Sequence, residues 1–432
     1  SGARLGSPPP LGTSRVGPLL DNPNIGLVPP GTYPTAAAEP FDGGLRLAAL
    51  GQPSIGIGND YFGTYVGGSV SALFSDLLGD KNLYTALQAQ GEIKDIGGQV
   101  FYQDLGQRWN WGLGASHVPY RYILRDVVVD PEEVPEAQFA ITDESRRIFV
   151  SEALGQLSYP FSAIRRVEFG AGYTHYGFDT DIQTNYYDFF GNWIGRDEIA
   201  PDSVQDPLDL AEVSIAFVED TSFSGFTGPV RGFRSRFEVG QTIGTATFTS
   251  VLADVRRYYS PLQELSFAVR GLHFGRYGVE SAGRGQILGD IFLGDEYFIR
   301  GYGSGTFDPE ECVPTNEGTC GDIERLMGQR IGVMNFEVRV PLLGTERFGL
   351  IPFPYRPTDL VGFVDAGVAW NEGDGAKLVW ERESSERIPV FSTGVSARVN
   401  LFGALVLEVY YAYPFQRPEK GGHWGLNFVP GW

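Results

Sequence analysis

The sequence has little of what several classes of function require. Of its 432 residues, two are cysteine, two are methionine and four are histidine. Lys and Arg number 33 against 53 Asp and Glu, so the chain lacks the basic surface that a nucleic-acid binder needs. It also has no run of about 18 apolar residues, which excludes a protein that crosses a membrane with helices.

The motifs of common enzyme sites are absent as well. The sequence contains no G-x-S-x-G, no G-x-x-x-x-G-K-[ST], no H-E-x-x-H and no C-x-x-C. Its histidines are scattered without metal-ligand spacing, and we interpret them as lumen or interface residues. We therefore predict no catalytic residue, no cofactor and no metal site.

What the sequence does contain indicates a large sheet. Hydrophobic residues make up 42% of the chain and aromatic residues 13%, which argues against disorder. The 58 glycines, the 21 tyrosines and a mean hydropathy of -0.13 are typical of a sheet with one face toward lipid and one toward water.

The two cysteines, Cys312 and Cys320, lie in one polar segment. They can form a metal or redox pair, or a disulfide that closes a small loop outside the cytosol. No histidine or further cysteine lies nearby to complete a zinc site, so we predict the disulfide.

Residues 1–51 are rich in Pro, Gly and Ala, and they follow neither the strand period nor the helix period. We predict an extended linker or strap that joins the chain to something upstream. Because the first residue is Ser and no signal peptide is visible, we expect a processed or truncated product. Residues 52–432 are predicted to form one domain.

Within residues 52–432, apolar and polar residues alternate in repeated segments, for example from Val390 to Leu401 and from Leu405 to Tyr413. Successive side chains of a strand face opposite ways, so each segment has one apolar and one polar face. A soluble sandwich would alternate in the same way. Several of these segments, however, run well past the usual five or six residues of soluble strands. The predicted strands are 52–61, 63–75, 81–93, 97–105, 107–125, 146–160, 163–180, 209–222, 231–243, 245–261, 264–277, 329–343, 359–371, 389–402, 404–416 and 423–432.

The connections between these strands alternate in length. Those at 126–145, 181–208, 279–328 and 372–388 are long and acidic, whereas most of the others are short. Short turns at one end and long loops at the other are typical of outer-membrane barrels. The sequence therefore predicts an all-β fold: a 16-stranded antiparallel transmembrane β-barrel with an extended N-terminal strap. The long loops should face outside and the strap should be periplasmic.

Three motifs follow one another in the last third of the chain. The longest loop contains Arg300-Gly301-Tyr302, the next strand contains Glu337, and the strand after it carries F-x-D-x-G at 363–367. In this order, with five strands after the loop, the motifs resemble those of the BamA/TamA superfamily of outer-membrane barrels, the bacterial surface antigens. Segments 51–58, 74–80 and 109–112 are similar to the barrels that follow TolB-like β-propellers.

The resemblance implies a lock between the loop and the lumen. Arg300, at a glycine-flanked tip, is expected to fold back into the lumen and to pair with Glu337 and Asp365. The alternative is that all three are solvated lumen charges. Tyr302 is either a wedge in the lumen or part of the loop packing. The predicted site residues are Arg300, Gly301, Tyr302, Glu337 and Asp365, with Phe363 and Gly367 in the strand motif.

The C-terminal strand places Trp424, Phe428 and Trp432 on one set of alternate positions. This pattern resembles the sorting signal that the outer-membrane assembly machinery reads. It is also what an interfacial aromatic girdle would give.

The resemblance implies a non-enzymatic protein of the Gram-negative bacterial outer membrane. Its expected function is protein insertion or translocation, or the anchoring of an upstream periplasmic domain or complex. The expected partners are outer-membrane lipid, lipopolysaccharide, and a possible upstream propeller or periplasmic subunits, with no nucleic acid. The alternative is a passive diffusion pore, whose lumen would be open.

Overall fold

The structure of the protein is a computed structural model, which separates into two units, Ser1–Gly44 and Leu45–Trp432. The described residues are 43–51, 54–60, 63–90, 93–129, 134, 137–199, 205–278, 289–308, 311, 321–346, 348–381, 386–401, 403 and 405–428. Only the last two residues of the first unit are among them, so residues 1–42 of the predicted strap lie outside the described residues.

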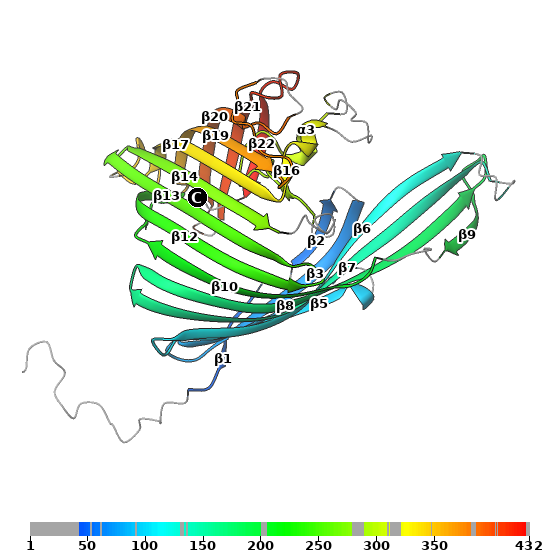
Figure 1. Cartoon of the computed structure of the whole chain (residues 1–432), viewed down its shortest axis with the longest axis horizontal. Coiled ribbons are helices and arrows are strands. Elements are labelled where there is room, and N and C mark those ends of the chain that lie inside the picture. Colours follow the sequence, from blue (N-terminus) through cyan, green and yellow to red (C-terminus); the bar gives the residue numbers. More distant parts are fainter. Residues whose placement is uncertain are drawn as a thin grey trace, which may run out of the picture. The chain divides into compact units, whose positions relative to one another are not determined.

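One sheet of twenty strands makes up most of the Leu45–Trp432 unit (Figure 1). Its strands are β1 (Arg46–Leu50), β2 (Ser54–Asp60), β3 (Gly63–Ser75), β4 (Lys81–Gln90), β5 (Ile96–Asp104), β6 (Asn110–Val129), β7 (Phe139–Ser162), β8 (Arg165–Tyr187), β9 (Trp193–Ile199), β10 (Leu208–Asp220), β11 (Phe223–Ser224), β12 (Pro229–Gly244), β13 (Phe248–Leu262), β14 (Leu265–Tyr277), β17 (Arg330–Gly344), β18 (Ile351–Pro352), β19 (Thr358–Trp370), β20 (Val390–Leu401), β21 (Leu405–Pro414) and β22 (His423–Phe428). Neighbours pair antiparallel, except for the short parallel pair β17–β18.

Each of the sixteen predicted ranges overlaps one strand of this sheet, and β1, β9, β11 and β18 are additional. The all-β antiparallel fold is confirmed, whereas the count of sixteen and the closure of a barrel are not. In the part of the chain that the structure describes, β22 pairs only with β21, and β1 and β2 pair only with β3.

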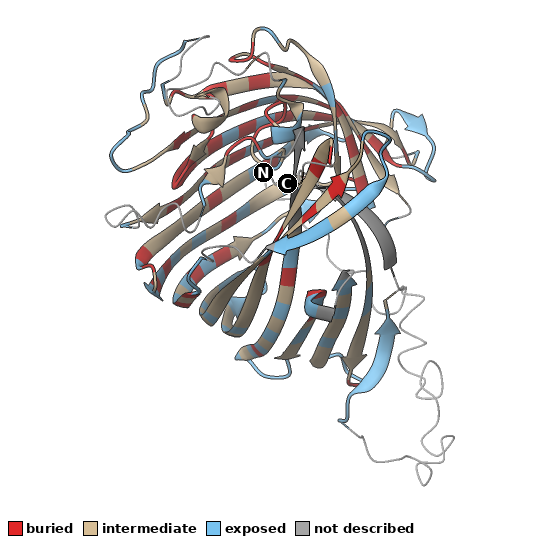
Figure 2. Ribbon diagram, turned by 90° about the vertical axis from the view of Figure 1, so that its right-hand side faces the viewer, coloured by how far each residue is buried: buried red, intermediate tan, exposed pale blue. Residues whose placement is uncertain are grey.

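Alternation along β19 shows how the sheet divides its faces. Val361, Phe363 and Asp365 are buried, whereas Leu360 and Val364 are exposed. We call the face that carries Phe363 and Asp365 the inner face, and the opposite face the outer face. Figure 2 shows the resulting red and blue bands along the strands.

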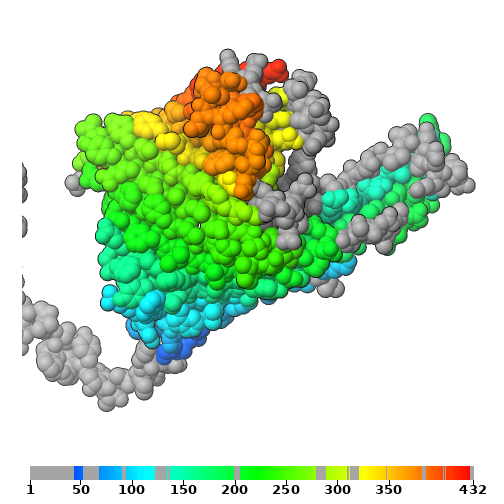
Figure 3. Space-filling model, in the orientation of Figure 1, coloured from blue at the N-terminus to red at the C-terminus, as the bar shows by residue number. Residues whose placement is uncertain are grey.

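Two of the predicted outer loops are partly strand, which corrects the prediction for 126–145 and 181–208. The β6–β7 ladder runs without interruption from Asn110–Ser158 to Val129–Phe139. β8 continues to Tyr187 and pairs there with β9. The four strands form a ribbon that projects from the rest of this unit (Figures 1 and 3). The rings of Phe139 and Tyr187 stack across β7 and β8 at the far end of the ribbon.

The segment predicted as a linker, 1–51, ends in a strand. β1 pairs with the second half of β3, from Arg46–Ser75 to Leu50–Ala72. β2 pairs with the first half of β3, from Ser54–Ser69 to Asp60–Gly63. Both therefore lie along the same edge of β3. The sheet begins before residue 52.

The largest apolar core lies on the inner face of β14, β17, β19 and β20 rather than between two sheets. Its buried members are Leu272, Leu293, Ile299, Tyr302, Leu326, Ile331, Val333, Ala369 and Val390. Four of them, Leu293, Ile299, Tyr302 and Leu326, come from the predicted 279–328 loop, so the loop is packed against the sheet. Helices are few and short, and no helix among the described residues is long and apolar enough to cross a membrane.

Candidate functional site

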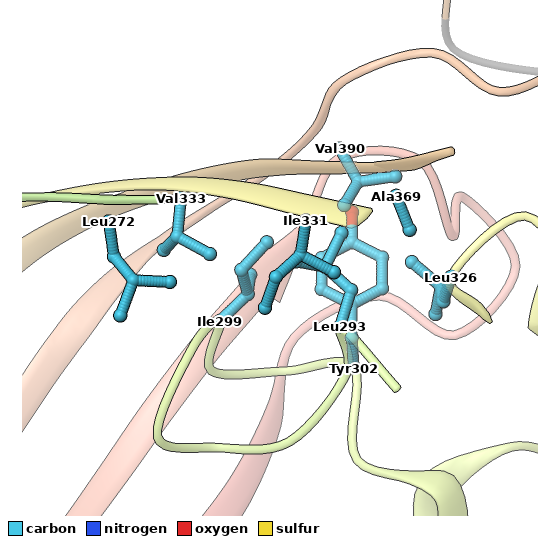
Figure 4. Packing of buried hydrophobic residues seen from close by; sticks show 9 residues of the cluster. All are labelled: Leu272, Leu293, Ile299, Tyr302, Leu326, Ile331, Val333, Ala369 and Val390. Carbon is cyan, nitrogen blue, oxygen red and sulfur yellow. The ribbon is translucent and has the colours of Figure 1, made fainter. Parts of the chain in front are cut away.

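The described part of the 279–328 loop lies against the inner face of the sheet. It contains β15 (Ile291–Phe292), which pairs with β16 (Met327–Gly328), and the short helices η5 (Ser304–Thr306) and α3 (Gly321–Glu324). Between them, Leu293, Ile299 and Tyr302 point toward Ile331 of β17 and its neighbours (Figure 4). Burial of these side chains holds the tip of the loop on the sheet.

Arg300 extends from this tip to the strand motif. Its Nε donates to Asp365 Oδ2 at 2.8 Å and its Nη2 donates to Asp365 Oδ1 at 2.9 Å. The backbone N–H of Arg300 donates to the same carboxylate at 3.2 Å. The two groups meet as a bidentate fork, the geometry that favours arginine over lysine.

Two further carboxylates surround the guanidinium. Arg300 Nη2 lies 2.9 Å from Glu337 Oε1, and Nη1 donates to Glu408 Oε1 at 3.0 Å. The Arg300 side chain is 3% exposed, that of Glu337 0% and that of Glu408 7%. The structure therefore brings together the predicted Arg300, Glu337 and Asp365, and adds Glu408. The alternative of solvated lumen charges does not fit side chains buried to this extent.

Two more arginines neutralise the cluster. Arg398 donates both Nη groups to Glu337, at 2.9 and 2.6 Å, and Arg339 Nε donates to Glu337 Oε2 at 2.7 Å. Three guanidinium groups thus meet the three carboxylates of Glu337, Asp365 and Glu408. Pairing of this kind is necessary, because an unpaired charge held away from water is costly.

The F-x-D-x-G motif has a contact for each of its three fixed residues. The guanidinium carbon of Arg300 lies 3.6 Å from the centre of the Phe363 ring, and Asp365 holds the same guanidinium. A Cβ on Gly367 would lie 2.5 Å from Ile299 Cδ1. All three residues share the inner face, so the motif is the surface on which the loop tip rests.

Position 301 favours glycine for two reasons, its backbone conformation and the closeness of its neighbours. Its φ is +90°, and a Cβ there would lie 3.1 Å from the Cβ of Ala412. Its carbonyl accepts a hydrogen bond from Arg417 Nη1 at 2.9 Å. Arg417 also donates to both carboxylate oxygens of Glu311 at 2.9 Å. It thereby joins the β21–β22 connection to the loop on the far side of the tip.

Tyr302 is fully buried, and its hydroxyl is satisfied. The hydroxyl donates toward Phe391 O at 2.9 Å or Gln416 Oε1 at 3.0 Å, and it accepts from the Gln416 backbone N–H at 3.2 Å. The ring is part of the apolar cluster of Figure 4. Its contacts are those of a wedge between the loop and the ends of β20 and β21.

The charge states within the loop follow from these contacts. Burial alone would lower the pKa of Arg300, but Asp365 and the neighbouring carboxylates raise that pKa well above its ordinary value. Burial raises the pKa of the Tyr302 hydroxyl. Burial also acts to raise the pKa of Glu311, but hydrogen bonds from Arg417 lower it below the usual range.

The other predicted site residues lie apart from this cluster. Cys312 and Cys320 are outside the described residues, so their disulfide stays a prediction. Trp424 and Phe428 are exposed on one face of β22, and Trp432 is outside the described residues. Both the sorting signal and the girdle stay predictions. Among the described residues, no group of three His, Cys, Asp or Glu side chains could hold a metal ion.

Sequence reasoning missed Arg339, Arg398, Glu408 and Arg417 as members of the site. The first three had a signal, since all occupy polar alternate positions of predicted strands and therefore face the same way as Glu337 or Asp365. Arg417 had none, because it lies in a connection without periodicity. The assembled residues can hold a loop inside the sheet at neutral net charge.

Comparisons with known proteins concern the fold and the family of the chain. The sequence profile of the Omp85 superfamily domain matches residues 97–431. No curated protein matches the chain significantly. The crystal structure of BamA from Haemophilus ducreyi lacking POTRA domains 1–3 is similar, with a TM-score of 0.52 at 12% identity over 88% of this chain and 76% of that one. CdiB from Escherichia coli has a TM-score of 0.49 at 11% identity, over 87% of this chain and 61% of that one. CdiB from Acinetobacter baumannii has a TM-score of 0.47 at 12% identity, over 86% of this chain and 57% of that one. At such identities, the likeness to BamA concerns the fold.

Proposed function

The chain belongs to the Omp85 superfamily, and on this premise we propose that it is a non-enzymatic β-barrel of the Gram-negative outer membrane. Sixteen principal strands would close into the barrel between β22 and the edge formed by β1 and β2. The outer face supports this, because Met334, Val364 and Trp424 are large apolar residues that it leaves exposed. Lipid and lipopolysaccharide would cover that face.

The functional proposal rests on the buried Arg300 cluster, which holds the 279–328 loop against the inner face. Within the proposed barrel, this loop would close the lumen. A passive diffusion pore needs a wide water-filled path, whereas here the loop tip fills the space beside β17, β19, β20 and β21. The cluster therefore favours a role other than diffusion.

The function we propose is protein insertion or translocation at the outer membrane. Among the described residues, β22 shares a ladder with β21 from Leu407–Phe428 to Ala412–His423 and pairs with no other strand. An edge strand of this kind next to a closed lumen offers a client strand an edge in the barrel wall. A second candidate, the anchoring of an upstream periplasmic propeller or complex, is favoured by the resemblance to barrels that follow such propellers.

Two measurements on the purified full chain separate these functions. In planar bilayers, a closed lumen gives small and erratic conductance, whereas an open pore gives a large and steady one. In liposomes, an insertase accelerates the folding of an unfolded eight-stranded barrel client over protein-free liposomes. Small conductance with acceleration supports insertion, and small conductance without it supports anchoring. Large steady conductance without acceleration would contradict both and indicate a diffusion pore.

A further inference from the structure

The connection between β10 and β12 makes contacts far from its own strands. Thr227, in this connection, donates a hydrogen bond from Oγ1 to Asp359 on β19. Asn400 on β20 donates to the backbone carbonyl of Phe226, and Arg339 Nη1 on β17 donates to Pro229 O at 2.8 Å. Residues 221–230, which we call the inner turn, are thus attached to three strands that are not their neighbours.

These contacts require the inner turn to cross the inner side of the sheet. Between β12 and β20 lie β13, β14, β17 and β19, which places β20 roughly 24 Å away along the sheet. Arg339 and Asp359 occupy the same alternate positions as Glu337 and Asp365, so they face inward. To reach Arg339 and Asp359, the inner turn crosses the concave side of the sheet.

The inner turn is also internally braced. Gly232 has a φ of +108°, and a Cβ there would lie 2.2 Å from Thr221 O. Thr221 Oγ1 accepts from the Phe233 backbone N–H at 2.9 Å, and Gly225 N–H donates to Gly228 O at 2.8 Å. Thr227 is 2% exposed. These hydrogen bonds fix the shape of the turn, and Thr227 attaches it to β19.

We propose that the inner turn closes the lumen at the end where the connections are short, opposite the end from which the 279–328 loop enters. This inference rests on the barrel of the proposed function. The lumen then has two closures, of which only the loop carries the family motifs. Both must open before water and ions can cross the barrel.

The two closures are linked through Glu337 and Arg339. Arg339 donates from Nε to Glu337 at 2.7 Å and from Nη1 to Pro229 O at 2.8 Å. Glu337 in turn lies 2.9 Å from Arg300 of the loop. Release of the loop therefore removes one partner of Glu337, the carboxylate that also binds Arg339, which is a physical route for coupling the two ends.

The inner turn has room to move without unfolding the strands. A cavity of about 810 Å³ lies beside it. Phe226 and Val230 of the inner turn line one side, and Leu262 and Phe348 line another. Displacement of Phe226 toward this apolar space would break the hydrogen bond between its carbonyl and Asn400. The inner turn would then no longer cross the short-connection end of the barrel.

The test is single-channel conductance of the full chain with the inner turn tied down or free. Cys312→Ser and Cys320→Ser remove the native thiols, and Arg300→Ala releases the loop. Thr227→Cys with Asp359→Cys then links the inner turn to β19 when oxidised. We expect oxidation to remove most of the conductance that Arg300→Ala opens, and a reductant to restore it. The matched control, Ser75→Cys with Asn82→Cys, links the β3–β4 hairpin to itself away from the inner turn and should leave conductance unchanged on oxidation.

Asn400→Ala in the Arg300→Ala background provides a second test without cysteines, and we expect it to raise conductance further. Each variant is first checked for folding by its gel mobility before and after heating. If conductance rises with Arg300→Ala but ignores both the crosslink and Asn400→Ala, the inner turn is no closure, while the loop closure stands. If no folded variant conducts at all, the water-filled barrel itself is wrong, and this proposal is overturned along with it.

Discussion

The wall built by β14–β21 and the wall built by β3–β8 differ in what their inner faces carry. Tyr410 on β21 is 0% exposed, whereas Tyr84, at an inward position of β4, is 39% exposed. The first wall supports the 279–328 loop and the inner turn, and it contains the Arg300 cluster. The difference indicates that inward side chains are buried where a loop or turn packs on their wall, and stay exposed where none does.

The charged groups of the two walls also differ. In the first wall, Glu337 and Asp365 have buried partners on separate strands and on the loop. In the second wall, the buried pair of Asp95 and Arg147 lies beside Asp181, whose side chain is half exposed. Water can replace part of a lost partner there, but not at the Arg300 cluster.

Among the substitutions proposed here, removal of Arg300 should destabilise the first wall and its loop most. Arg300→Ala leaves Asp365, Glu337 and Glu408 buried with one guanidinium fewer, and breaking a buried pair typically costs about 3–5 kcal/mol. The loop should then become a fast site of protease cleavage in intact cells. Arg300→Lys, which keeps the charge but not the fork, should be intermediate. Unchanged cleavage in Arg300→Ala would show that apolar packing alone holds the loop.

Gly367→Val should have the next largest effect, because its Cβ would meet Ile299 Cδ1 at 2.5 Å and Gly332 O at 3.0 Å. Overpacking of this kind costs about 1–3 kcal/mol and should lift the loop from β19. Gly362→Val on the same strand is the matched control, since a Cβ there would meet nothing within 4 Å. Denaturant unfolding and loop proteolysis measure both variants, and equal behaviour would contradict the packing of the loop on β19.

Asp95→Ala tests the second wall. Asp95 is fully buried and accepts from Arg147 Nε at 3.0 Å, next to the ribbon of β6–β9. Its loss should cost roughly 1–3 kcal/mol, because Arg147 keeps other partners. We expect faster hydrogen exchange in β6 and β7 and no change in conductance. A rise in conductance would show that the second wall also controls the lumen.

Gln88→Ala should have the smallest effect. Gln88 lies at an inward position of β4, where no described residue packs above it closely enough to bury it. Substitutions at such positions usually change stability by less than about 0.5 kcal/mol. The unfolding midpoint and the conductance of Gln88→Ala should match those of the unaltered chain. A clear difference in either would contradict the claim that inward side chains of the second wall matter less than those of the first.

Sequence patterns predicted the strands well, because alternation reports directly which face is apolar. They also placed Arg300 with Asp365 and Glu337, since three motifs occurred in order. They did not show that β20 and β21 bring Arg398 and Glu408 to the same point, because convergence depends on the curvature of the sheet.

Other features had no local signal. The connection at 221–230 looks like any short turn, and its inward course depends on contacts with strands more than a hundred residues away. Residues 126–145 and 181–208 looked like acidic loops, yet β6, β7 and β8 extend into them as continuous paired ladders. Arg46–Leu50 lies in a Pro- and Gly-rich segment and forms β1 only because β3 offers a free edge.

The central claim is that one buried contact, between Arg300 and Asp365, holds the 279–328 loop in place on the inner face. A double-mutant cycle on single-channel conductance tests it most directly. Arg300→Ala and Asp365→Ala should each raise conductance above that of the unaltered chain. The double variant should be no more conductive than the more conductive single variant, because both substitutions remove the same interaction. Conductance that rises additively, or does not rise in either single variant, would contradict the account.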